Sequence, residues 1–213
     1  MNHHLVSCIM PTANREKYIP FAINYFLQQD YENKELIIVD DGLKPIKDLV
    51  PTNSQIKYYY TAPFSSIGFK RNFACSKANG EIIVHWDDDD WHAEDWLSAE
   101  VHFLTTTDAD ICGIQHIHYY SPIINQMKTI IRRYDGPDPM NWVHGATMAY
   151  WKSFWEQHHF KDLQKGEDDD FIQHTGAKLF IHGYTDGFIC LLHPHNTIIR
   201  EFENPLQKKK INK

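Results

Sequence analysis

Cysteine is scarce in this 213-residue chain, which has four cysteines and no pair spaced as C-x-x-C. Neither a disulfide framework nor a cysteine zinc site is therefore predicted, and a reducing, cytoplasmic compartment is expected. Glycine and proline number ten each, which is too few for a collagen-like or disordered chain. Residues 1–15 lack the pattern of a signal peptide, and no apolar run approaches the roughly 18 residues that a membrane span requires.

A basic stripe is also missing, since 21 Lys and Arg residues stand against 28 Asp and Glu residues and the formal charge is -7. Eight of the acids lie in two clusters, Asp87–Asp90 and Glu167–Asp170. This distribution argues against nucleic acid as a partner. The single basic run, Lys208–Lys213, indicates either a solvated tail or a weak contact with the inner face of a membrane.

The hydrophobic residues, 42% of the chain, are enough for a sizeable core, and their spacing alternates between strand and helix patterns. The expected strands are Leu5–Met10, Leu36–Val39, Ile56–Tyr60 and Glu81–Trp86, and the expected helices are Ile19–Leu27, Ile67–Lys77 and Glu94–Phe103. Alternation of this kind predicts an α/β domain with a largely parallel sheet, in which ligands bind beyond the carboxyl ends of the strands.

Polar segments follow three of the expected strands. They are Pro11–Arg15, Asp40–Gly42 and Asp87–Asp90. Because the carboxyl ends of parallel strands meet at one edge of a sheet, these segments are expected to form one site, completed by residues beyond Thr107.

The run Asp87–Asp90 indicates a divalent cation and a diphosphate, because such cations take one or two carboxylates and fill their remaining positions with water and phosphate oxygens. The alternative is a solvated acidic turn with Asp90 capping the next helix. A calcium loop of the EF-hand type is excluded, since its glycine and glutamate positions hold His92 and Ser98. Trp91 argues in the same way against an aspartyl-phosphate phosphatase.

The second cluster, Glu167–Asp170, opens a helical pattern. Helix capping accounts for one or two of these acids, because a carboxylate at the start of a helix is stabilised by the helix dipole. A partly buried acid that faces a pocket is the other interpretation, and such a group serves as a general base.

In sequence order, these segments resemble the inverting nucleotide-sugar glycosyltransferases of glycosyltransferase family 2, which have the GT-A fold. The opening strand Val6–Thr12 and the segment Leu36–Gly42 are similar to the first two signatures of that family. Gly68, Arg71 and Asn72, then 78–83, match the segment before its Asp-x-Asp motif, and Asp87–Asp90 stand at that motif. Gly166–Asp168 match the Glu-Asp pair that carries the base.

The resemblance implies a role for each matching residue. Contacts with the nucleotide sugar, most simply a UDP-sugar, are implied for Pro11, Thr12, Asn14, Arg15, Asp40, Asp41, Arg71, Asp87 and Asp88. Asp89 would bind Mn²⁺ or Mg²⁺, with His193 as a further metal or diphosphate contact. Asp168 would be the catalytic base. Acceptor contacts are implied for Trp142, His144, Gly145 and Glu167, although Trp142 is equally suited to the core.

One departure and two alternatives remain. Leu43–Pro45 follow Gly42 where the family usually has Ser or Thr, which leaves the nucleobase contacts of that loop open. A sugar-phosphate nucleotidyltransferase on a related fold would favour a glycine-rich first loop, and Pro11–Arg15 contain no glycine. A non-catalytic sugar-nucleotide or glycan-binding module is the other alternative.

We therefore expect one GT-A-like domain over residues 1–213. About 1–106 would bind the nucleotide sugar and metal, about 107–200 would bind the acceptor, and 201–213 would form the basic tail. The expected reaction is inverting transfer of a sugar to a glycan, a lipid-linked glycan or a protein.

Overall fold

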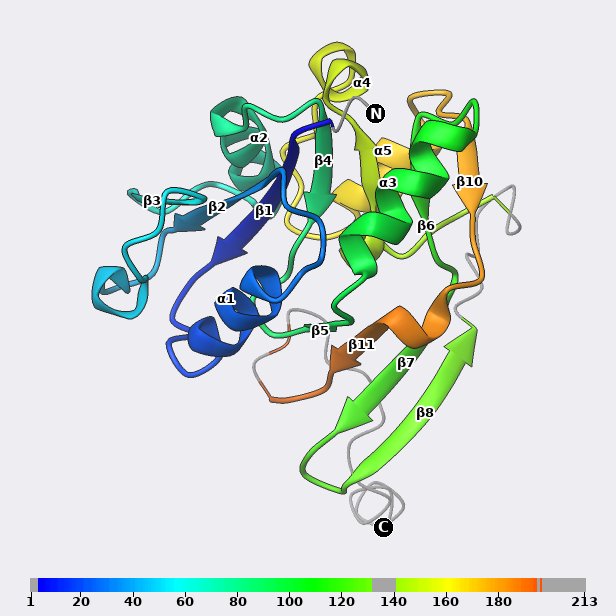
Figure 1. Cartoon of the computed structure of the whole chain (residues 1–213). Coiled ribbons are helices and arrows are strands. Elements are labelled where there is room, and N and C mark those ends of the chain that lie inside the picture. Colours follow the sequence, from blue (N-terminus) through cyan, green and yellow to red (C-terminus); the bar gives the residue numbers. More distant parts are fainter. Residues whose placement is uncertain (1–3, 132–140, 195, 197–213) are drawn as a thin grey trace, which may run out of the picture.

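The computed structural model describes residues 4–131, 141–194 and 196 of the chain, and the lysine-rich tail lies outside these residues. A seven-stranded sheet forms the centre, with the strand order β10-β6-β9-β4-β1-β2-β3 (Figure 1). Its strands are β1 (Val6–Thr12), β2 (Lys34–Asp40), β3 (Ile56–Tyr60), β4 (Ile82–His85), β6 (Ile111–Gly113), β9 (Ala149–Trp151) and β10 (Leu179–Ile181). All neighbours are parallel except β9, which runs antiparallel to both β4 and β6.

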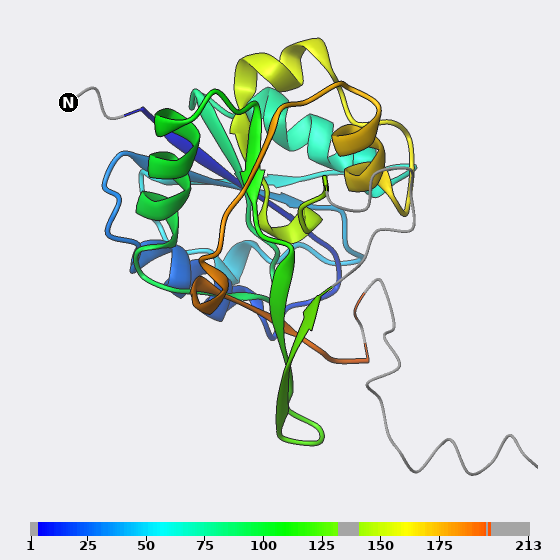
Figure 2. The ribbon, with the colours of Figure 1, turned by 90° about the vertical axis from the view of Figure 1, so that its right-hand side faces the viewer.

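Helices cover both faces of this sheet, so the domain has three layers (Figure 2). The helices are α1 (Ile19–Leu27), α2 (Ile67–Lys77), α3 (Trp96–Thr106), α4 (Lys152–Gln157) and α5 (Glu167–Gln173). One core packs α1 and α3 against the sheet, and a second core packs α2, α4 and α5 against the opposite face. The predicted α/β class is therefore confirmed.

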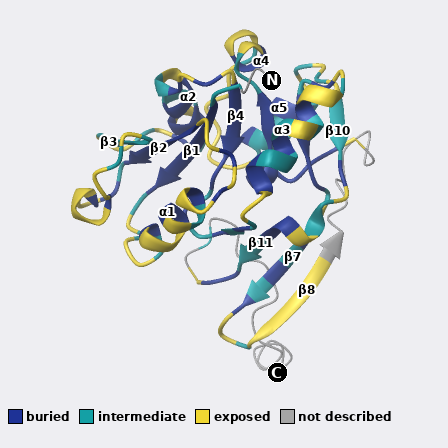
Figure 3. Cartoon of the chain, viewed as in Figure 1, coloured by how far each residue is buried: buried dark blue, intermediate teal, exposed yellow. Residues whose placement is uncertain are grey.

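The central strands are buried on both faces, and Figure 3 shows β1, β2 and β4 in the colour of buried residues. Every residue of β1, β2 and β4 is buried, including Lys34 and Glu35. Continuous apolar runs of this kind are typical of parallel strands between two helical layers. Parallel pairing of β1 with β2 and with β4 places the carboxyl ends of these three strands on one edge of the sheet.

A second, smaller sheet continues from this edge with the order β5-β11-β7-β8. It consists of β5 (Trp91–His92), β7 (His116–Ser121), β8 (Gln126–Ile131) and β11 (Phe188–Leu191). The hairpin β7–β8 projects from the body of the domain (Figure 2). Short 3-10 turns lie at Lys47–Leu49, Gly145–Thr147 and Thr185–Gly187. No helix in the described part of the chain is long and apolar enough to cross a membrane.

Candidate active site

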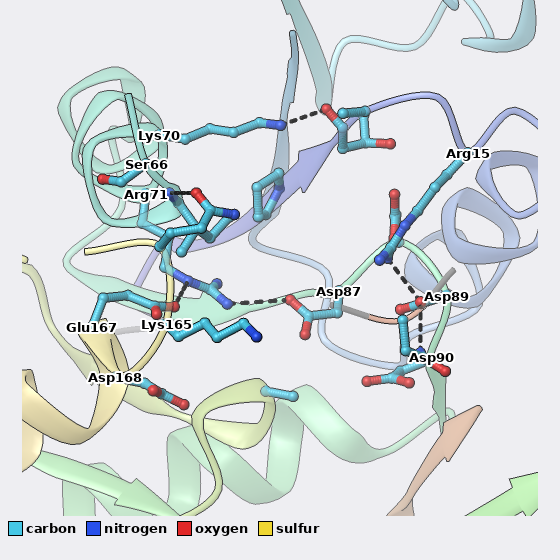
Figure 4. A pocket seen from close by; sticks show the side chains of 18 of the residues that line it. Arg15, Ser66, Lys70, Arg71, Asp87, Asp89, Asp90, Lys165, Glu167 and Asp168 are labelled. Carbon is cyan, nitrogen blue, oxygen red and sulfur yellow. Dashed lines mark hydrogen bonds and ion pairs between the residues drawn. The ribbon is translucent and has the colours of Figure 1, made fainter. Parts of the chain in front are cut away.

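A cavity of about 420 Å³ lies where the carboxyl ends of β1, β2 and β4 meet the start of α5 (Figure 4). The segments that the sequence placed at this edge do converge there. The predicted residues that line the cavity are Pro11, Thr12, Arg15, Asp41, Arg71, Asp87, Asp88, Asp89, His144, Glu167 and Asp168. Buried polar atoms without a hydrogen-bond partner in the described residues also gather here, namely Thr12 Oγ1, Arg71 Nη1 and Asp88 Oδ2. A cavity lined by unsatisfied polar atoms is suited to a polar ligand.

The acidic turn, Asp87–Asp90, follows β4 and is held by one arginine from the loop after β1. Nη1 of Arg15 donates to Asp88 Oδ1 at 2.7 Å and to Asp89 Oδ2 at 2.8 Å. His193 Nε2 lies 2.7 Å from the same oxygen of Asp89, so the late segment of the chain closes on the turn. Asp90 accepts from Leu191 N at 3.0 Å. Asp90 therefore anchors the end of β11 and does not cap the next helix, which begins at Trp96.

Burial raises the pKa of three carboxyl groups in the acidic turn, those of Asp87, Asp88 and Asp90. Burial raises the pKa of Asp88 to about 6, although Arg15 opposes the increase. Burial also raises the pKa of Asp87, against the effect of Arg71, and that of Asp90, where Asp89 and Asp87 add to the increase. Raised values mean that the clustered carboxylates repel one another and lack solvation. A bound cation would relieve this repulsion.

Arg71 connects the acidic turn to the second acidic cluster. Its Nε donates to Glu167 Oε1 at 3.2 Å, and its Nη2 lies 3.5 Å from Asp87 Oδ1. Burial acts to lower the pKa of Arg71, but Asp87 and Glu167 raise it above its ordinary value. Burial raises the pKa of Glu167, although Arg71 acts against the increase. The guanidinium is thus a fixed positive charge in the wall between the two clusters.

Asp168 enters the cavity from the first turn of α5. Gly166 precedes the helix with φ +77°, a left-handed conformation that favours glycine and turns the chain into the cavity. Oδ1 of Asp168 accepts from Asp169 N at 2.9 Å, and the carboxylate lies against Gly145. Gly145 is fixed in turn because its carbonyl oxygen lies 2.6 Å from Nδ1 of the buried His85. Backbone contacts therefore set the position of the Asp168 carboxylate.

The opposite end of the cavity is formed by Asp41 and Lys70. Lys70 Nζ donates to Asp41 Oδ1 and to the carbonyl oxygen of Thr12, both at 2.5 Å. Asp41 Oδ2 accepts from Phe64 N at 3.1 Å. Burial lowers the pKa of Lys70, and the neighbouring Asp41 opposes the change. Both oxygens of Asp41 are thus oriented by the protein, and each keeps capacity for a further donor.

Five predicted residues do not line the cavity. Asn14 is exposed and accepts from Leu43 N, and His193 contacts the site through Asp89. Trp142 is buried and donates to Asp169 Oδ1 at 2.6 Å, so the core interpretation of this residue holds. Gly145 supports Asp168 from behind.

Asp40, the fifth of these residues, is fully buried at the end of β2. One carboxylate oxygen accepts from Gly42 N, and the other accepts from Ile46 N and Tyr58 Oη. This ring of hydrogen bonds shapes the loop that carries Asp41. Asp40 therefore supports the site by holding the loop that follows β2.

Two basic residues and one acid of the cavity were missed by the sequence analysis. Lys70 precedes Arg71 on α2, and Lys165 precedes Gly166 on the loop before α5. Asp90 is part of the predicted acidic run, but it is given no role of its own there beyond the alternative of a helix cap. Adjacency to a recognised motif was the available signal for both lysines, but a lysine beside a motif is common on any exposed surface.

The donor set of the acidic turn fits a hard divalent cation whose coordination is completed by phosphate oxygens. Among the described residues, no three His, Cys, Asp or Glu side chains are grouped as a metal site made by protein alone. Such a cage is not required, because Mg²⁺ and similar ions use one or two carboxylates together with substrate phosphates. Asp89 in the cavity, the unpartnered Asp88 Oδ2 and the raised pKa of Asp87 are consistent with this mode.

The three-layer architecture of the chain is the GT-A fold. Solved structures with the same fold include S. aureus TarS 1-349 in complex with UDP-GlcNAc, with a TM-score of 0.75 and 19% identity over 90% of this chain and 60% of that one. Another is the mannosyltransferase PcManGT from Pyrobaculum calidifontis in complex with GDP-Man and Mn²⁺, with a TM-score of 0.68 and 18% identity over 90% of this chain and 57% of that one.

The chain belongs to glycosyl transferase family 2, whose sequence model matches residues 7–181. An uncharacterized glycosyltransferase of Haemophilus influenzae is 34% identical over 109 residues, which are 49% of this chain and 44% of the relative. The UDP-Glc:alpha-D-GlcNAc-diphosphoundecaprenol beta-1,3-glucosyltransferase WfgD of Escherichia coli is 36% identical over 107 residues, 49% of this chain and 42% of the relative. The chain thus matches about half the length of these curated relatives.

Proposed function

We propose that the protein transfers a sugar from a UDP-sugar to an acceptor hydroxyl, with inversion at the anomeric carbon and with a divalent cation bound at the acidic turn. The observation that carries this proposal is that Asp168 and the acidic turn Asp87–Asp90 face one cavity. The reaction requires a site that stabilises the departing diphosphate and a base that takes the proton of the acceptor hydroxyl. Residues 1–106 would supply the first and residues 107–200 the second.

The donor would lie along the cavity in its covalent order of base, ribose, diphosphate and sugar. Pro11, Thr12 and Asp41 would contact the nucleobase, with Asp41 Oδ2 accepting from the ring. Asp87 would bind the ribose and Arg71 the diphosphate. Asn14 and Asp40 would act indirectly, by shaping the two loops of the nucleobase end.

Asp89 would hold the cation, with His193 orienting its carboxylate and Asp88 beside it. Such a cation, Mn²⁺ or Mg²⁺, neutralises the diphosphate that departs. Arg15 fixes the turn before any donor arrives, so little reorganisation is needed on binding.

Asp168 would take the proton of the acceptor hydroxyl as the hydroxyl oxygen attacks the anomeric carbon. The bond from that carbon to the diphosphate oxygen breaks, and its electron pair leaves with UDP. Glu167 would hold Arg71 and border the acceptor with His144, while Trp142 and Gly145 would keep α5 and Asp168 in place. Alignment of the reacting atoms supplies much of the acceleration in such a displacement.

The donor and acceptor classes rest on the relatives. WfgD is named for a UDP-glucose donor and a diphosphoundecaprenol-linked acceptor, and TarS was solved with UDP-GlcNAc. We propose a UDP-sugar donor and a glycan acceptor, free or carried on a lipid or a protein. A thermal-shift screen of UDP, GDP and their sugars, each with and without Mn²⁺, tests the donor class, because a ligand of the folded state raises the Tm.

Asp168→Asn tests the reaction itself. We expect UDP-sugar binding to persist while turnover at saturating donor falls by about 10²-fold or more, since removal of a general base has effects of that size. Asp48→Asn, which removes an exposed acid remote from the cavity, is the matched control. Near-normal turnover of Asp168→Asn would show that Asp168 is not the base. Absence of donor hydrolysis and of transfer in a wild-type protein that binds UDP would favour a non-catalytic binding module.

A further inference from the structure

The positively charged side chains that line the cavity differ in whether they pair with a carboxylate. Four lysine and arginine side chains line it in the described part of the chain, and three of them are paired with carboxylates. Arg15 pairs with the acidic turn, Lys70 with Asp41, and Arg71 with Glu167. The fourth, Lys165, has no carboxylate within 4.0 Å among the described residues, although the two acidic clusters lie on either side of it (Figure 4).

The loop that carries Lys165 is fixed to the first turn of α2. Gln164 Oε1 accepts from Ile67 N at 3.1 Å, and the carbonyl oxygen of Leu163 accepts from Gly68 N at 3.2 Å. A side chain at Gly68 would overlap the carbonyl oxygen of Lys161, so the loop and the helix are in direct backbone contact. Lys165 is therefore presented from an anchored backbone.

The next residue, Gly166, sets the direction of the Lys165 side chain. Gly166 turns the chain, so that Lys165 and Glu167 both line the same cavity. Figure 4 shows the Lys165 side chain extending from this loop toward Asp87, across the space between α5 and the acidic turn. Arg71 Nη1, which is buried and unpartnered within the described residues, belongs to the same part of the wall.

The covalent order of a nucleotide sugar identifies the group that would occupy this space. The nucleobase end lies at Asp41 and the reacting carbon must reach Asp168, so the diphosphate falls between Asp87 and Asp168. An ammonium group without a carboxylate partner at that point matches an anion, and lysine binds phosphate as a point charge. The pairs made by the other three basic residues leave Lys165 as the charge with no internal competitor within the described residues.

We propose that Lys165 binds the diphosphate of the donor and stabilises the negative charge that develops on it as the bond to the sugar breaks. This proposal rests on the proposed function, because it assumes a nucleoside diphosphate in the cavity. No proton is transferred by Lys165: the acceptor proton goes to Asp168, and the electron pair of the broken bond stays on the diphosphate oxygen beside the ammonium group.

Binding of UDP and of UMP to Lys165→Ala tests the inference, with Mn²⁺ present and calorimetry as the readout. We expect UDP to bind about tenfold more weakly than to the wild type, the lower end of the contribution of a charged hydrogen bond, while UMP, which lacks the β-phosphate, binds nearly as before. Lys165→Arg should recover most of the UDP affinity. Lys161→Ala is the matched control, since it removes the same charge from the same loop but from a side chain that pairs with Asp170.

The outcomes distinguish a failure of the role of Lys165 from a failure of the proposed donor. Unchanged UDP affinity in Lys165→Ala, or an equal loss for UDP and UMP, overturns the role of Lys165. The same loss in Lys161→Ala overturns it too, because loop charge alone would then explain the effect. A wild-type protein that binds neither UDP nor a UDP-sugar overturns the proposed donor, and the assignment of Lys165 with it.

Discussion

The carboxylate of Asp168 lies directly against the α-carbon of Gly145, so that a methyl group at residue 145 would overlap its atoms. Gly145→Ala must therefore displace the carboxylate or the 3-10 turn that carries residue 145. We expect turnover to fall by 10-fold to about 10²-fold, because misplacement of a catalytic group by about 1 Å has effects of that order. Steady-state kinetics with varied acceptor measure the loss.

Gly183→Ala provides the control for that substitution. No described atom lies within 4 Å of a Cβ atom at residue 183, so the added methyl group meets open space. Equal turnover in Gly145→Ala and Gly183→Ala would contradict the view that Gly145 positions Asp168.

Burial of His92 makes the stability of the protein depend on pH. Its ring stacks on Trp86 at 3.8 Å between centroids, and both ring nitrogens are buried without a hydrogen-bond partner in the described residues. Burial lowers the pKa of His92 to about 3. Below the ordinary histidine pKa of about 6.5, His92 is protonated in the unfolded chain but stays neutral in the folded protein. The free energy of unfolding therefore falls as the pH decreases from about 6.5 towards 3.

His92→Phe should remove this part of the pH dependence. Relative to the wild type, the variant should gain about 1 kcal/mol between pH 8 and pH 5.5, as expected for one imidazole that stays neutral in the folded state. Denaturant unfolding at the two pH values measures the difference. His102→Phe, on the exposed side of α3, should leave the pH dependence unchanged. An identical slope in wild type and His92→Phe would contradict the assignment.

Glu35 also makes the protein less stable at low pH, but through interactions that are favourable when its carboxylate is charged. It accepts from Ser7 Oγ and Asn79 N, both at 2.6 Å, and its other oxygen lies 2.6 Å from Lys57 Nζ. Burial acts to raise the pKa of Glu35, but these donors outweigh it and lower the pKa. The stabilisation is therefore present above the ordinary pKa of about 4.5 and is lost as the pH falls through and below that value.

Glu35→Gln should reduce the free energy of unfolding by about 1–2 kcal/mol at pH 7, and the difference from wild type should shrink below pH 4.5. Glu32→Gln, an exposed neighbour, should change little. Urea titrations at pH 7 and pH 4 make the comparison. A constant difference at both pH values would mean that the charge of Glu35 is not responsible.

Asp89 is expected to carry the metal dependence. Its Oδ2 accepts from Arg15, His193 and Asn196, which orient the carboxylate toward the cavity. The wild-type Tm in UDP should rise further on addition of Mn²⁺ and return on chelation, whereas Asp89→Asn should lose the Mn²⁺ increment. An Asp89→Asn protein that kept both the increment and its activity would place the cation elsewhere.

Sequence periodicity predicted the elements next to the site well, since β3 and α2 begin and end at the predicted residues. The strand expected from periodicity ends at Met10, whereas β1 continues through Pro11 to Thr12, as the resemblance implies. Proline is accommodated because the pairing of β1 with β4 ends at Ile9, while Pro11 pairs in register with Val39 of β2. Position within the sheet, which local sequence does not contain, decided this boundary.

The second sheet and strand β9 were not predicted, because they consist of short segments whose partners are distant in sequence. β5 has two residues and pairs with β11, almost a hundred residues later. The acidic turn and Asp168 were found through ordered motifs. Asp40, by contrast, sits within a recognised motif, and only its three hydrogen-bond partners reveal that it serves the loop.

Strand β9 has a consequence for how the domain forms. It lies between β4 and β6 and is the only described strand that joins β6 and β10 to the rest of the central sheet. Until Ala149–Trp151 are synthesised, β4 presents an open edge of four residues that are fully buried in the finished domain. Unpaired, apolar strand edges are sites of aggregation. A nascent chain that ends before Ala149 is thus expected to depend on chaperones until β9 closes this edge.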